Sequence, residues 1–316
     1  MKQNDRTDAL LRGNAWRTAF LAALLLCLCA GAFAEDAEAL YVENEWNYVD
    51  GSMDISGGIP ADAEGVLGAI REAGVLRVGT EPYFPPQEFI DENLSGQDRY
   101  VGSDMELARR VAERMGVELE IIPMEFTDLL DAVAEGKCDL VISALSYTPG
   151  RAVAVEFSKG YYFAGYDYGS GVLIRSEDQE EIAGVDDLAD RTIVAQRGSV
   201  QEALAAENIM LYLEFRRLAS VQQLYDAVAG GRADAAVVDY QTAQTYVKNN
   251  PDAGLMLLPD VYFLLEEQFK GDRIAAKRGE LQLIYFVNGV IDEVTAEGQY
   301  QKWFDEYDDY ATNQGT

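Results

Sequence analysis

The chain of 316 residues contains no histidine and only three cysteines, Cys27, Cys29 and Cys138. Without histidine, a Ser-His-Asp or Cys-His triad, a histidine-ligated metal and a histidine general base are all excluded. Two cysteines fall in an N-terminal apolar stretch, which leaves Cys138 without a disulfide partner in the folded part. We therefore expect Cys138 to be a small buried core residue. We expect no metal, no cofactor and no catalytic residue.

Basic residues are also scarce, with 25 Lys and Arg against 55 Asp and Glu and a net charge of −30. Such a surface repels phosphate backbones and anionic lipids, so nucleic acid is not an expected partner. The sequence also lacks a Walker loop, a dinucleotide glycine fingerprint and a CxxC pair. A composition of 48% hydrophobic and 25% charged residues predicts a soluble globular protein large enough for two lobes.

The first 34 residues have the pattern of a secretory signal. Four basic residues precede the apolar stretch 18–34, which ends in the small-x-small triplet Ala32-Phe33-Ala34. This pattern predicts cleavage after residue 34 and a location in the periplasm or at the cell surface. A retained membrane anchor is the main alternative. Lipid attachment at Cys27 or Cys29 is a weaker one, because a leucine precedes each cysteine.

The rest of the chain alternates between helical and strand patterns. Residues 35–62 are acidic and lack periodicity, which predicts a tether or an irregular arm. From residue 63 onward the alternation predicts an α/β fold with largely parallel sheets. We expect a helix over 65–73, a strand over 75–80, a proline-stiffened loop over 81–89, a helix over 103–115 that starts with a Ser103/Glu106 capping box, and a strand over 117–124.

Two stretches resemble each other, "FTDLLDAVAEGKCDLVISA" at 126–144 and "VQQLYDAVAGGRADAAVVD" at 221–239. Each predicts a helix that ends at a glycine and is followed by a basic residue, an aspartate and a buried strand. The chain is therefore expected to contain two similar α/β lobes. A chance likeness between two helix-turn-strand units is the alternative.

The two repeats differ in chemistry where their strands end, which is where open α/β sheets bind ligands. The first continues into Ser146, then Thr148 as a helix cap, and Arg151 in the first helical turn. A cation at a helix start opposes the macrodipole, so Arg151 suits anion binding better than helix stability. The second repeat ends in Asp239, aligned with Ala144. An arginine facing a carboxylate predicts a zwitterionic ligand, and two unrelated surface ion pairs are the alternative.

Several stretches also resemble a known family. The motifs "LRVGTEPYFPPQEF", "YVGSDMELARRVAERMG", "VDDLADRTIVAQRGSVQEAL" and "GQYQKWFDEY", with the Ser146-x-Thr148-x-x-Arg151 element, are similar to the polar amino-acid-binding proteins of bacterial ABC importers, solute-binding protein family 3, over about residues 65–310. The resemblance implies a two-lobed periplasmic-binding-protein type II fold with a two-strand hinge and a ligand cleft between the lobes. Lobe 1 would comprise 63–163 and 268–316, lobe 2 would comprise 164–267, and the hinge would lie near 161–166 and 266–272.

The resemblance also implies roles for nine residues. Arg151 and the Ser146 hydroxyl would bind the ligand carboxylate, and Asp239 and the Ala144 carbonyl would bind its ammonium. The remaining implied contacts are aromatic walls from Phe84 and Phe126, a side-chain contact from Glu81, and backbone amides at Ser199 and Val200. Ser199 also fits a capping box with Glu202, and the two phenylalanines could be plain core residues. Val200 departs from the usual hydroxyl, and Gln87 stands where an aromatic is common.

The predicted function is that of a monomeric extracytoplasmic protein, not an enzyme, which captures a free L-α-amino acid and delivers it to an ABC transporter permease. Glu81 in the side-chain pocket predicts a polar or cationic amino acid. One alternative is an enzyme similar to cyclohexadienyl dehydratases, for which only Glu81 and Asp239 are available as acids. A sensor that presents ligand to a receptor is the other alternative.

Overall fold

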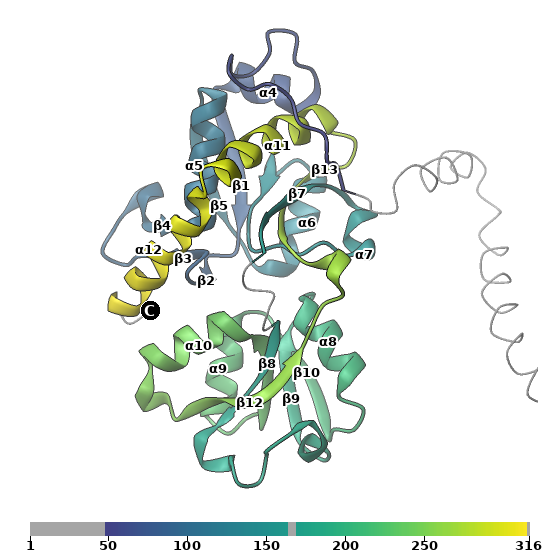
Figure 1. Cartoon of the computed structure of the whole chain (residues 1–316), viewed down its shortest axis with the longest axis vertical. Coiled ribbons are helices and arrows are strands. Elements are labelled where there is room, and N and C mark those ends of the chain that lie inside the picture. The colour runs from purple at the N-terminus through teal and green to yellow at the C-terminus, as the bar shows by residue number, and fades with distance from the viewer. Residues whose placement is uncertain (1–47, 164–168, 315–316) are drawn as a thin grey trace, which may run out of the picture. The chain divides into compact units, whose positions relative to one another are not determined.

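The computed structural model describes residues 48–163 and 169–314, which form two five-stranded sheets and one three-stranded sheet (Figure 1). The predicted signal segment, residues 35–47 of the predicted arm and residues 164–166 of the first predicted hinge segment lie outside these residues. Within the described ranges, no helix has both the length and the apolar character that a membrane span needs. The predicted α/β class is confirmed.

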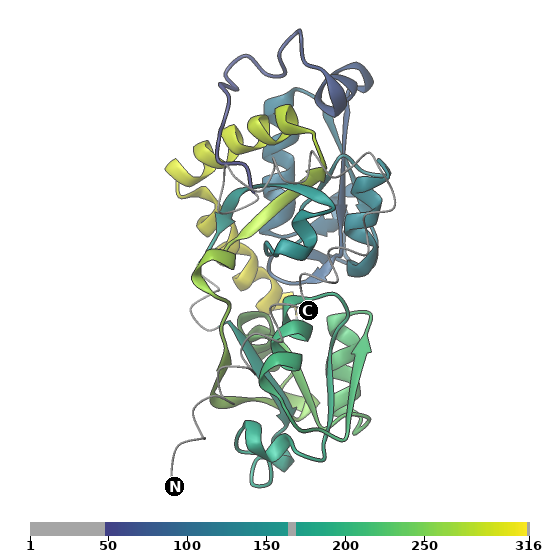
Figure 2. The ribbon, with the colours of Figure 1, turned by 90° about the vertical axis from the view of Figure 1, so that its right-hand side faces the viewer.

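Lobe 1 is defined here by the sheet of order β5-β1-β6-β13-β7, and the helices that pack on it. Its strands are β1 (Val75–Thr80), β5 (Glu118–Pro123), β6 (Leu140–Val141), β7 (Val155–Tyr162) and β13 (Asp272–Lys277). Its helices are α4 (Gly65–Ala73), α5 (Ser103–Met115), α6 (Leu129–Ala134), α7 (Pro149–Ala152), α11 (Leu281–Ala296) and α12 (Gln299–Gln314). Both α11 and α5 contact this sheet, and Figure 2 shows the yellow-green α11 beside its strands.

Lobe 2 is defined by the sheet of order β10-β9-β11-β8-β12. Its strands are β8 (Ser170–Arg175), β9 (Thr192–Gln196), β10 (Glu214–Leu218), β11 (Ala235–Asp239) and β12 (Leu255–Phe263). Its helices are α8 (Val200–Asn208), α9 (Val221–Ala229) and α10 (Tyr240–Asn249). The chain therefore leaves the first sheet after β7 and returns to it at β13.

The expectation of largely parallel sheets is only half right. In each sheet three neighbouring strands are parallel, β5-β1-β6 and β10-β9-β11. The next strand of each, β13 or β8, is antiparallel to both of its neighbours. These two strands are the ones that the chain enters from the other lobe, so their direction is set by the crossing and not by a local strand-helix-strand unit.

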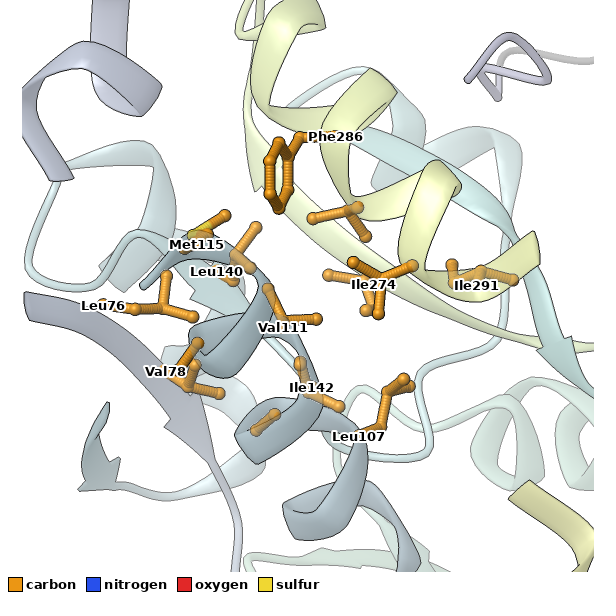
Figure 3. Packing of buried hydrophobic residues seen from close by; sticks show 14 of the residues in the cluster. Leu76, Val78, Leu107, Val111, Met115, Leu140, Ile142, Ile274, Phe286 and Ile291 are labelled. Atoms are coloured by element: carbon orange, nitrogen blue, oxygen red, sulfur yellow. The ribbon is translucent and has the colours of Figure 1, made fainter. Parts of the chain in front are cut away.

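The core of lobe 1 lies between its sheet and α5 and α11 (Figure 3). Helix α5 buries the apolar face that its sequence predicts, including Leu107, Val111 and Met115. These side chains pack with Val78 of β1 and Phe286 of α11 in one cluster. Full burial of one such side chain stabilises the folded state by about 1.5 to 3 kcal/mol. The cluster therefore holds β1 firmly against the helices, and β1 leads to the cavity described below.

Residues 48–62 form neither helix nor strand, but they are fastened to lobe 1. The Asn288 side-chain amide of α11 donates to the carbonyls of Val49 (2.6 Å) and Gly51 (2.7 Å). The Val49 N–H donates to the Phe157 carbonyl at 2.9 Å, and Ile55 is buried in the lobe 1 core. This part of the predicted arm is irregular and packed.

Two local predictions are wrong. Residues 81–89 contain strands, because β2 (Tyr83–Phe84), β3 (Glu88–Ile90) and β4 (Tyr100–Val101) form the three-stranded sheet. Ser103 does not cap α5, since the helix begins at Ser103 and its N-cap is Gly102 with φ 120°. A Cβ at Gly102 would lie 2.2 Å from the Gln87 carbonyl oxygen, so this approach of two backbones requires glycine.

Candidate functional site

One cavity, at the carboxyl ends of the parallel strands, is lined by residues of both lobes. Its lining includes all nine residues that the sequence analysis selected: Glu81, Phe84, Phe126, Ala144, Ser146, Arg151, Ser199, Val200 and Asp239. The structure therefore brings these residues together from β2, α7, α8, β11, the segments that follow β1 and β6, and the 3-10 turn Phe126–Asp128. Their roles toward a ligand remain predictions.

Arg151 lies in the first turn of α7, on the lobe 1 side of the cavity. The predicted cap is confirmed, because Thr148 Oγ1 accepts a hydrogen bond of 3.2 Å from the Arg151 backbone N–H. The guanidinium donates through Nη1 to the Ser146 carbonyl (2.6 Å) and through Nη2 to the Gly198 carbonyl of lobe 2 (2.9 Å). Its central carbon lies 5.4 Å from the Phe126 ring centroid. Contacts with both lobes thus orient this positive charge at the cavity.

Asp239 is the last residue of β11 and the N-cap of α10. Its Oδ1 accepts a hydrogen bond of 2.8 Å from the Thr242 backbone N–H. Burial raises the pKa of Asp239, and hydrogen bonds from the first turn of α10 oppose that rise. The hydrogen-bond donors to this carboxylate are thus groups of its own helix. Because none of these donors is a cation, a positively charged ligand group would further stabilise the ionised form.

Ala144 occupies the strand end of lobe 1 in the left-handed region, with φ 43°. Its N–H donates to Asp104 Oδ2 at 2.8 Å. A non-glycine residue in this conformation is strained by roughly 1 to 2 kcal/mol, and the buried carboxylate of Asp104 offsets this strain. The bond anchors the turn in which strand β6 leads on to Ser146.

Glu81 follows β1 directly and is 2% exposed. Both of its carboxylate oxygens lie 2.8 Å from Nε2 of Gln196, the last residue of β9 in lobe 2. Its backbone N–H donates to Ser143 Oγ at 3.0 Å. Burial raises the pKa of Glu81 to about 7, although the hydrogen bond from Gln196 lowers it. The carboxyl group therefore changes its ionisation near neutral pH, and its partner comes from the opposite lobe.

Glu88 and Asp104 form a buried carboxyl pair at the lobe 1 side of the cavity, with 1% and 0% exposure. Asp104 accepts from the Tyr300 hydroxyl at 2.5 Å and the Tyr161 hydroxyl at 2.8 Å, and Glu88 Oε1 accepts from Ser143 Oγ at 3.0 Å. Burial raises the pKa of both groups, and that of Glu88 lies well above its usual value. Asp104 accepts more hydrogen bonds, and these oppose the rise of its pKa.

The aromatic and lobe 2 residues have structural contacts as well as cavity positions. Phe126 packs against the cluster that contains the buried Cys138, and Phe84 of lobe 1 packs against a core cluster of lobe 2. Ser199 caps α8, because its Oγ accepts from the Glu202 N–H at 3.1 Å. Val200 is the first residue of that helix. The predicted capping by Ser199 and burial of Cys138 are confirmed.

Sequence reasoning missed polar residues that also line the cavity, chiefly Gln196, Glu88 and Asp272. Gln87, noted only as a departure, donates through Nε2 to Asp272 Oδ2 at 2.9 Å. Gln196 ends β9, a strand that was not predicted, and the rule that selected Asp239 applies to the end of this strand as well. Asp272 lies in the predicted hinge range 266–272, but no motif marks it.

Most of the ionisable groups that line the cavity are acidic. Four carboxyl groups line it, those of Glu81, Glu88, Asp239 and Asp272, against the single guanidinium of Arg151. Such a lining favours a ligand that carries a carboxylate for Arg151 and positive charge elsewhere. In the part of the chain that the structure describes, no group of three or more Cys, Asp or Glu side chains is placed to hold a metal ion.

Comparisons with known proteins identify a matching family and similar sequences. Residues 76–309 match the model of the bacterial extracellular solute-binding proteins, family 3. The chain is 29% identical over 234 residues to the arginine-binding extracellular protein ArtP of Bacillus subtilis, a match that covers 72% of this chain and 86% of ArtP. It is 27% identical over 246 residues to the L-cystine-binding protein TcyJ of Escherichia coli, covering 76% and 86% of the two chains.

Solved structures show the same fold. An amino acid ABC transporter substrate-binding protein, AbpA of Streptococcus pneumoniae, bound to L-arginine, is 30% identical, with a TM-score of 0.68 over 76% of this chain and 97% of that one. The ancestral amino acid-binding protein AncCDT-1, a precursor of cyclohexadienyl dehydratase, is 28% identical, with a TM-score of 0.66 over 77% and 99%. The predicted two-lobed type II fold is confirmed.

Proposed function

Because this chain belongs to family 3 of the bacterial extracellular solute-binding proteins, we propose that it captures a free L-α-amino acid outside the cytoplasmic membrane and delivers it to an ABC importer. The observation that carries this proposal is the single cavity that combines Arg151 of lobe 1 with Asp239 of lobe 2. A guanidinium binds a carboxylate in a fork, and a carboxylate accepts hydrogen bonds from an ammonium. The two groups of a free amino acid satisfy both.

The cavity supports a specific assignment of contacts. Arg151 and the Ser146 hydroxyl bind the ligand carboxylate, together with the backbone amides at Ser199 and Val200. Asp239 and the Ala144 carbonyl bind the ammonium. Phe84 and Phe126 flank the ligand, and Phe126 already lies against the Arg151 guanidinium.

The ligand side chain is cationic in this proposal. This assignment of contacts leaves Glu81 and Asp272 of the cavity lining for the ligand side chain, and each accepts a hydrogen bond from an amide, that of Gln196 or Gln87. A guanidinium or ammonium would form charge-assisted hydrogen bonds with such carboxylates. ArtP and AbpA, both named for or solved with arginine, are relatives of this chain. L-Arginine is therefore the first ligand to test.

Binding closes the two lobes about the segments near 161–166 and 266–272. Residues on both lobes line the cavity, so a ligand that contacts both gains more from the closed arrangement than from the open one. Scattering should show a smaller radius of gyration with saturating L-arginine. An unchanged radius would remove hinge closure from the proposal.

The protein acts as a monomeric carrier and not as an enzyme. A dehydratase is the second candidate, because Glu81 is a buried acid with a pKa of about 7 and because AncCDT-1 is a precursor of such an enzyme. Incubation with prephenate or arogenate separates the two, since only the enzyme forms an aromatic product. A sensor would share the binding site, and only the partner that the loaded protein contacts, a permease or a receptor, distinguishes it.

The decisive experiment pairs blocked ligands with variants of the two charged groups. Calorimetry should show that the wild-type protein binds L-arginine far better than argininamide or N-acetylarginine. In Arg151→Ala the preference over argininamide should disappear while the preference over N-acetylarginine stays. Asp239→Asn should show the opposite pattern. If blocked ligands bind the wild-type protein as tightly as L-arginine does, the zwitterion site is wrong.

A further inference from the structure

A series of buried hydrogen bonds connects two parts of the cavity lining. It starts at Asp272, the first residue of β13, whose Oδ2 accepts from Gln87 Nε2 at 2.9 Å. The same nitrogen donates to the Tyr300 hydroxyl at 3.3 Å, and that hydroxyl donates to Asp104 Oδ1 at 2.5 Å. Asp104 Oδ2 then accepts from the Ala144 N–H at 2.8 Å. The four side chains are each at most 6% exposed. We call this series the hydrogen-bond chain.

Tyr300 is the central member of the hydrogen-bond chain, and its contacts fix its position. It belongs to helix α12, is 4% exposed and does not line the cavity. Its ring centroid lies 5.1 Å from that of Tyr161 in β7. Its hydroxyl donates to Asp104 and accepts from Gln87 and, at 3.0 Å, from Ser103 Oγ. One donor and two acceptor sites are all that a hydroxyl has, and a buried network whose members are fully satisfied is rigid.

The two ends of the hydrogen-bond chain line the cavity. The inference rests on the proposed function, in which the Ala144 carbonyl binds the α-ammonium and Asp272 accepts from a cationic side chain. Ala144 is strained at φ 43°, and the bond from its N–H to Asp104 stabilises this conformation. The direction of the Ala144 carbonyl and the position of the Asp272 carboxylate are therefore both set by bonds that lead to Tyr300.

A fixed separation between two acceptors selects ligands by their length. A cationic side chain that is one methylene too short or too long reaches only one acceptor well, and the weaker charge-assisted bond lowers the affinity. We propose that Tyr300 is a positioning residue that determines specificity, because its hydroxyl keeps the acceptors at Ala144 and Asp272 at the separation that one ligand length fits. Tyr300 acts through Asp104 and Gln87 and does not itself contact the ligand.

Guanidino amino acids of increasing length test the proposal: L-norarginine, L-arginine and L-homoarginine, each one methylene longer than the one before. Calorimetry gives their dissociation constants for the wild-type protein and for Tyr300→Phe, which keeps the ring and removes only the hydroxyl. The wild-type protein should prefer one length, and Tyr300→Phe should reduce that preference roughly three- to tenfold, the range for the loss of one hydrogen bond. Equal weakening of all the ligands would indicate a purely structural role and overturn the proposal, as would a wild-type protein without a preference.

Tyr307→Phe is the matched control. Tyr307 lies on the same helix and its hydroxyl donates to Glu106 Oε1 at 2.8 Å, but neither residue lines the cavity. This variant also loses a bond between a tyrosine and a carboxylate, yet it should keep the wild-type ratios of the affinities. If its ratios fell as far as those of Tyr300→Phe, the effect would come from helix α12 as a whole and the proposal would be wrong.

A second variant interrupts the hydrogen-bond chain elsewhere and serves even if Tyr300→Phe folds poorly. Gln87→Met has a side chain of similar length without the amide, so it should reduce the length preference as Tyr300→Phe does. The double variant should reduce it no further, because both substitutions remove the same connection. Additive losses would indicate separate roles and refute the hydrogen-bond chain. If the wild-type protein bound none of the ligands, the cationic side chain of the proposed function would be wrong and this inference with it, whereas a preference that survives Tyr300→Phe would refute this inference alone.

Discussion

The two repeats, 126–144 and 221–239, have the same hydrogen-bond frame and different strand ends. In the first, the Asp139 N–H donates to the Arg77 carbonyl at 2.8 Å, and the Arg77 N–H donates back to Asp139 Oδ2 at 2.8 Å. In the second, Asp234 and Thr192 exchange the same two bonds, at 2.9 and 2.7 Å. The repeat aspartate therefore links the start of its own strand to the neighbouring parallel strand, β1 in lobe 1 and β9 in lobe 2.

Beyond this link the two halves diverge. Strand β6 ends after two residues, and the chain turns at Ala144, whose φ is 43°. Strand β11 continues through five residues to Asp239, which then caps α10. Counting four residues on from Arg77 and Thr192 gives Glu81 and Gln196, which hydrogen-bond to each other across the lobes. The shared frame thus places four equivalent strand ends at one cavity, and the residue at each end sets the chemistry.

The largest effect is expected from removing the charge at the lobe 2 strand end. Asp239→Asn keeps an oxygen that can accept from the Thr242 N–H, but it no longer carries charge for an ammonium. Binding of L-arginine should weaken by about 2 to 5 kcal/mol, because the ligand ammonium is left unpaired in the cavity. Calorimetry measures the loss.

Asp239→Ala is the matched variant, since it removes the helix cap as well. Its affinity should be as low as that of Asp239→Asn, and its free energy of unfolding should fall by a further amount of about 1 kcal/mol. If Asp239→Asn kept wild-type affinity, the carboxylate that distinguishes this strand end from that of the first repeat would have no role in ligand binding.

The next-largest effect is expected in the pH dependence of stability, which depends on Glu81 and its hydrogen-bond partner Gln196. Because the folded state raises the pKa of Glu81 to about 7, the native protein binds a proton more readily than the unfolded chain between about pH 4.5 and 7. This contribution to stability is complete below pH 4.5 and is lost as the pH rises to 7, with a total of about 3 kcal/mol at most. Glu81→Gln should therefore remove that fall from the dependence of unfolding free energy on pH, measured by urea denaturation.

Ligand binding is expected to favour the ionised form of Glu81, whereas folding favours its protonated form. A cationic side chain beside Glu81 favours the ionised carboxyl, so L-arginine should bind more tightly at pH 8 than at pH 6 and should release a proton. Calorimetry in buffers of different ionisation enthalpy counts this proton, and Glu81→Gln should reduce the count. Equal affinity at both pH values would separate Glu81 from the ligand side chain.

The sequence was sufficient for what repeats or patterns encode locally. The repeat itself, the Thr148 and Ser199 caps and the apolar face of α5 follow from spacing, and the structure contains them. The predictions failed where two segments that are distant in the sequence come close together in the fold. Gly102 replaces Ser103 as the cap because the Gln87 backbone passes within reach of it, and no local pattern records that neighbour. The role of Gln196 was missed for the same reason, since its partner Glu81 is on the other lobe.

A smaller effect compares the two linking aspartates. The Asp139 side chain is 7% exposed and is paired with Arg77 at 2.6 Å, whereas Asp234 is 28% exposed and lies 3.6 Å from Arg175. Asp139→Ala should lower the free energy of unfolding by about 2 kcal/mol and Asp234→Ala by about 1 kcal/mol, because the more buried bonds are lost with less compensation from water. Urea denaturation of both variants gives the comparison. A larger loss in Asp234→Ala would show that burial does not rank the two links.

The smallest difference is expected at the glycines that end the repeat helices, where the two halves should behave alike. Gly136 has φ 76° and Gly231 has φ 66°, both in the left-handed region. An added Cβ would meet no atom within 4 Å at either position, so Gly136→Ala and Gly231→Ala change only the backbone preference. Each should lower the free energy of unfolding by about 1 kcal/mol, from the strain of a left-handed alanine, and the two values should agree within about 0.5 kcal/mol. L-Arginine affinity should not change, since neither glycine lines the cavity. Thermal and urea unfolding of the two variants make the measurement, and a clearly larger loss at one glycine would mean that the repeats differ in their frame as well as at their strand ends.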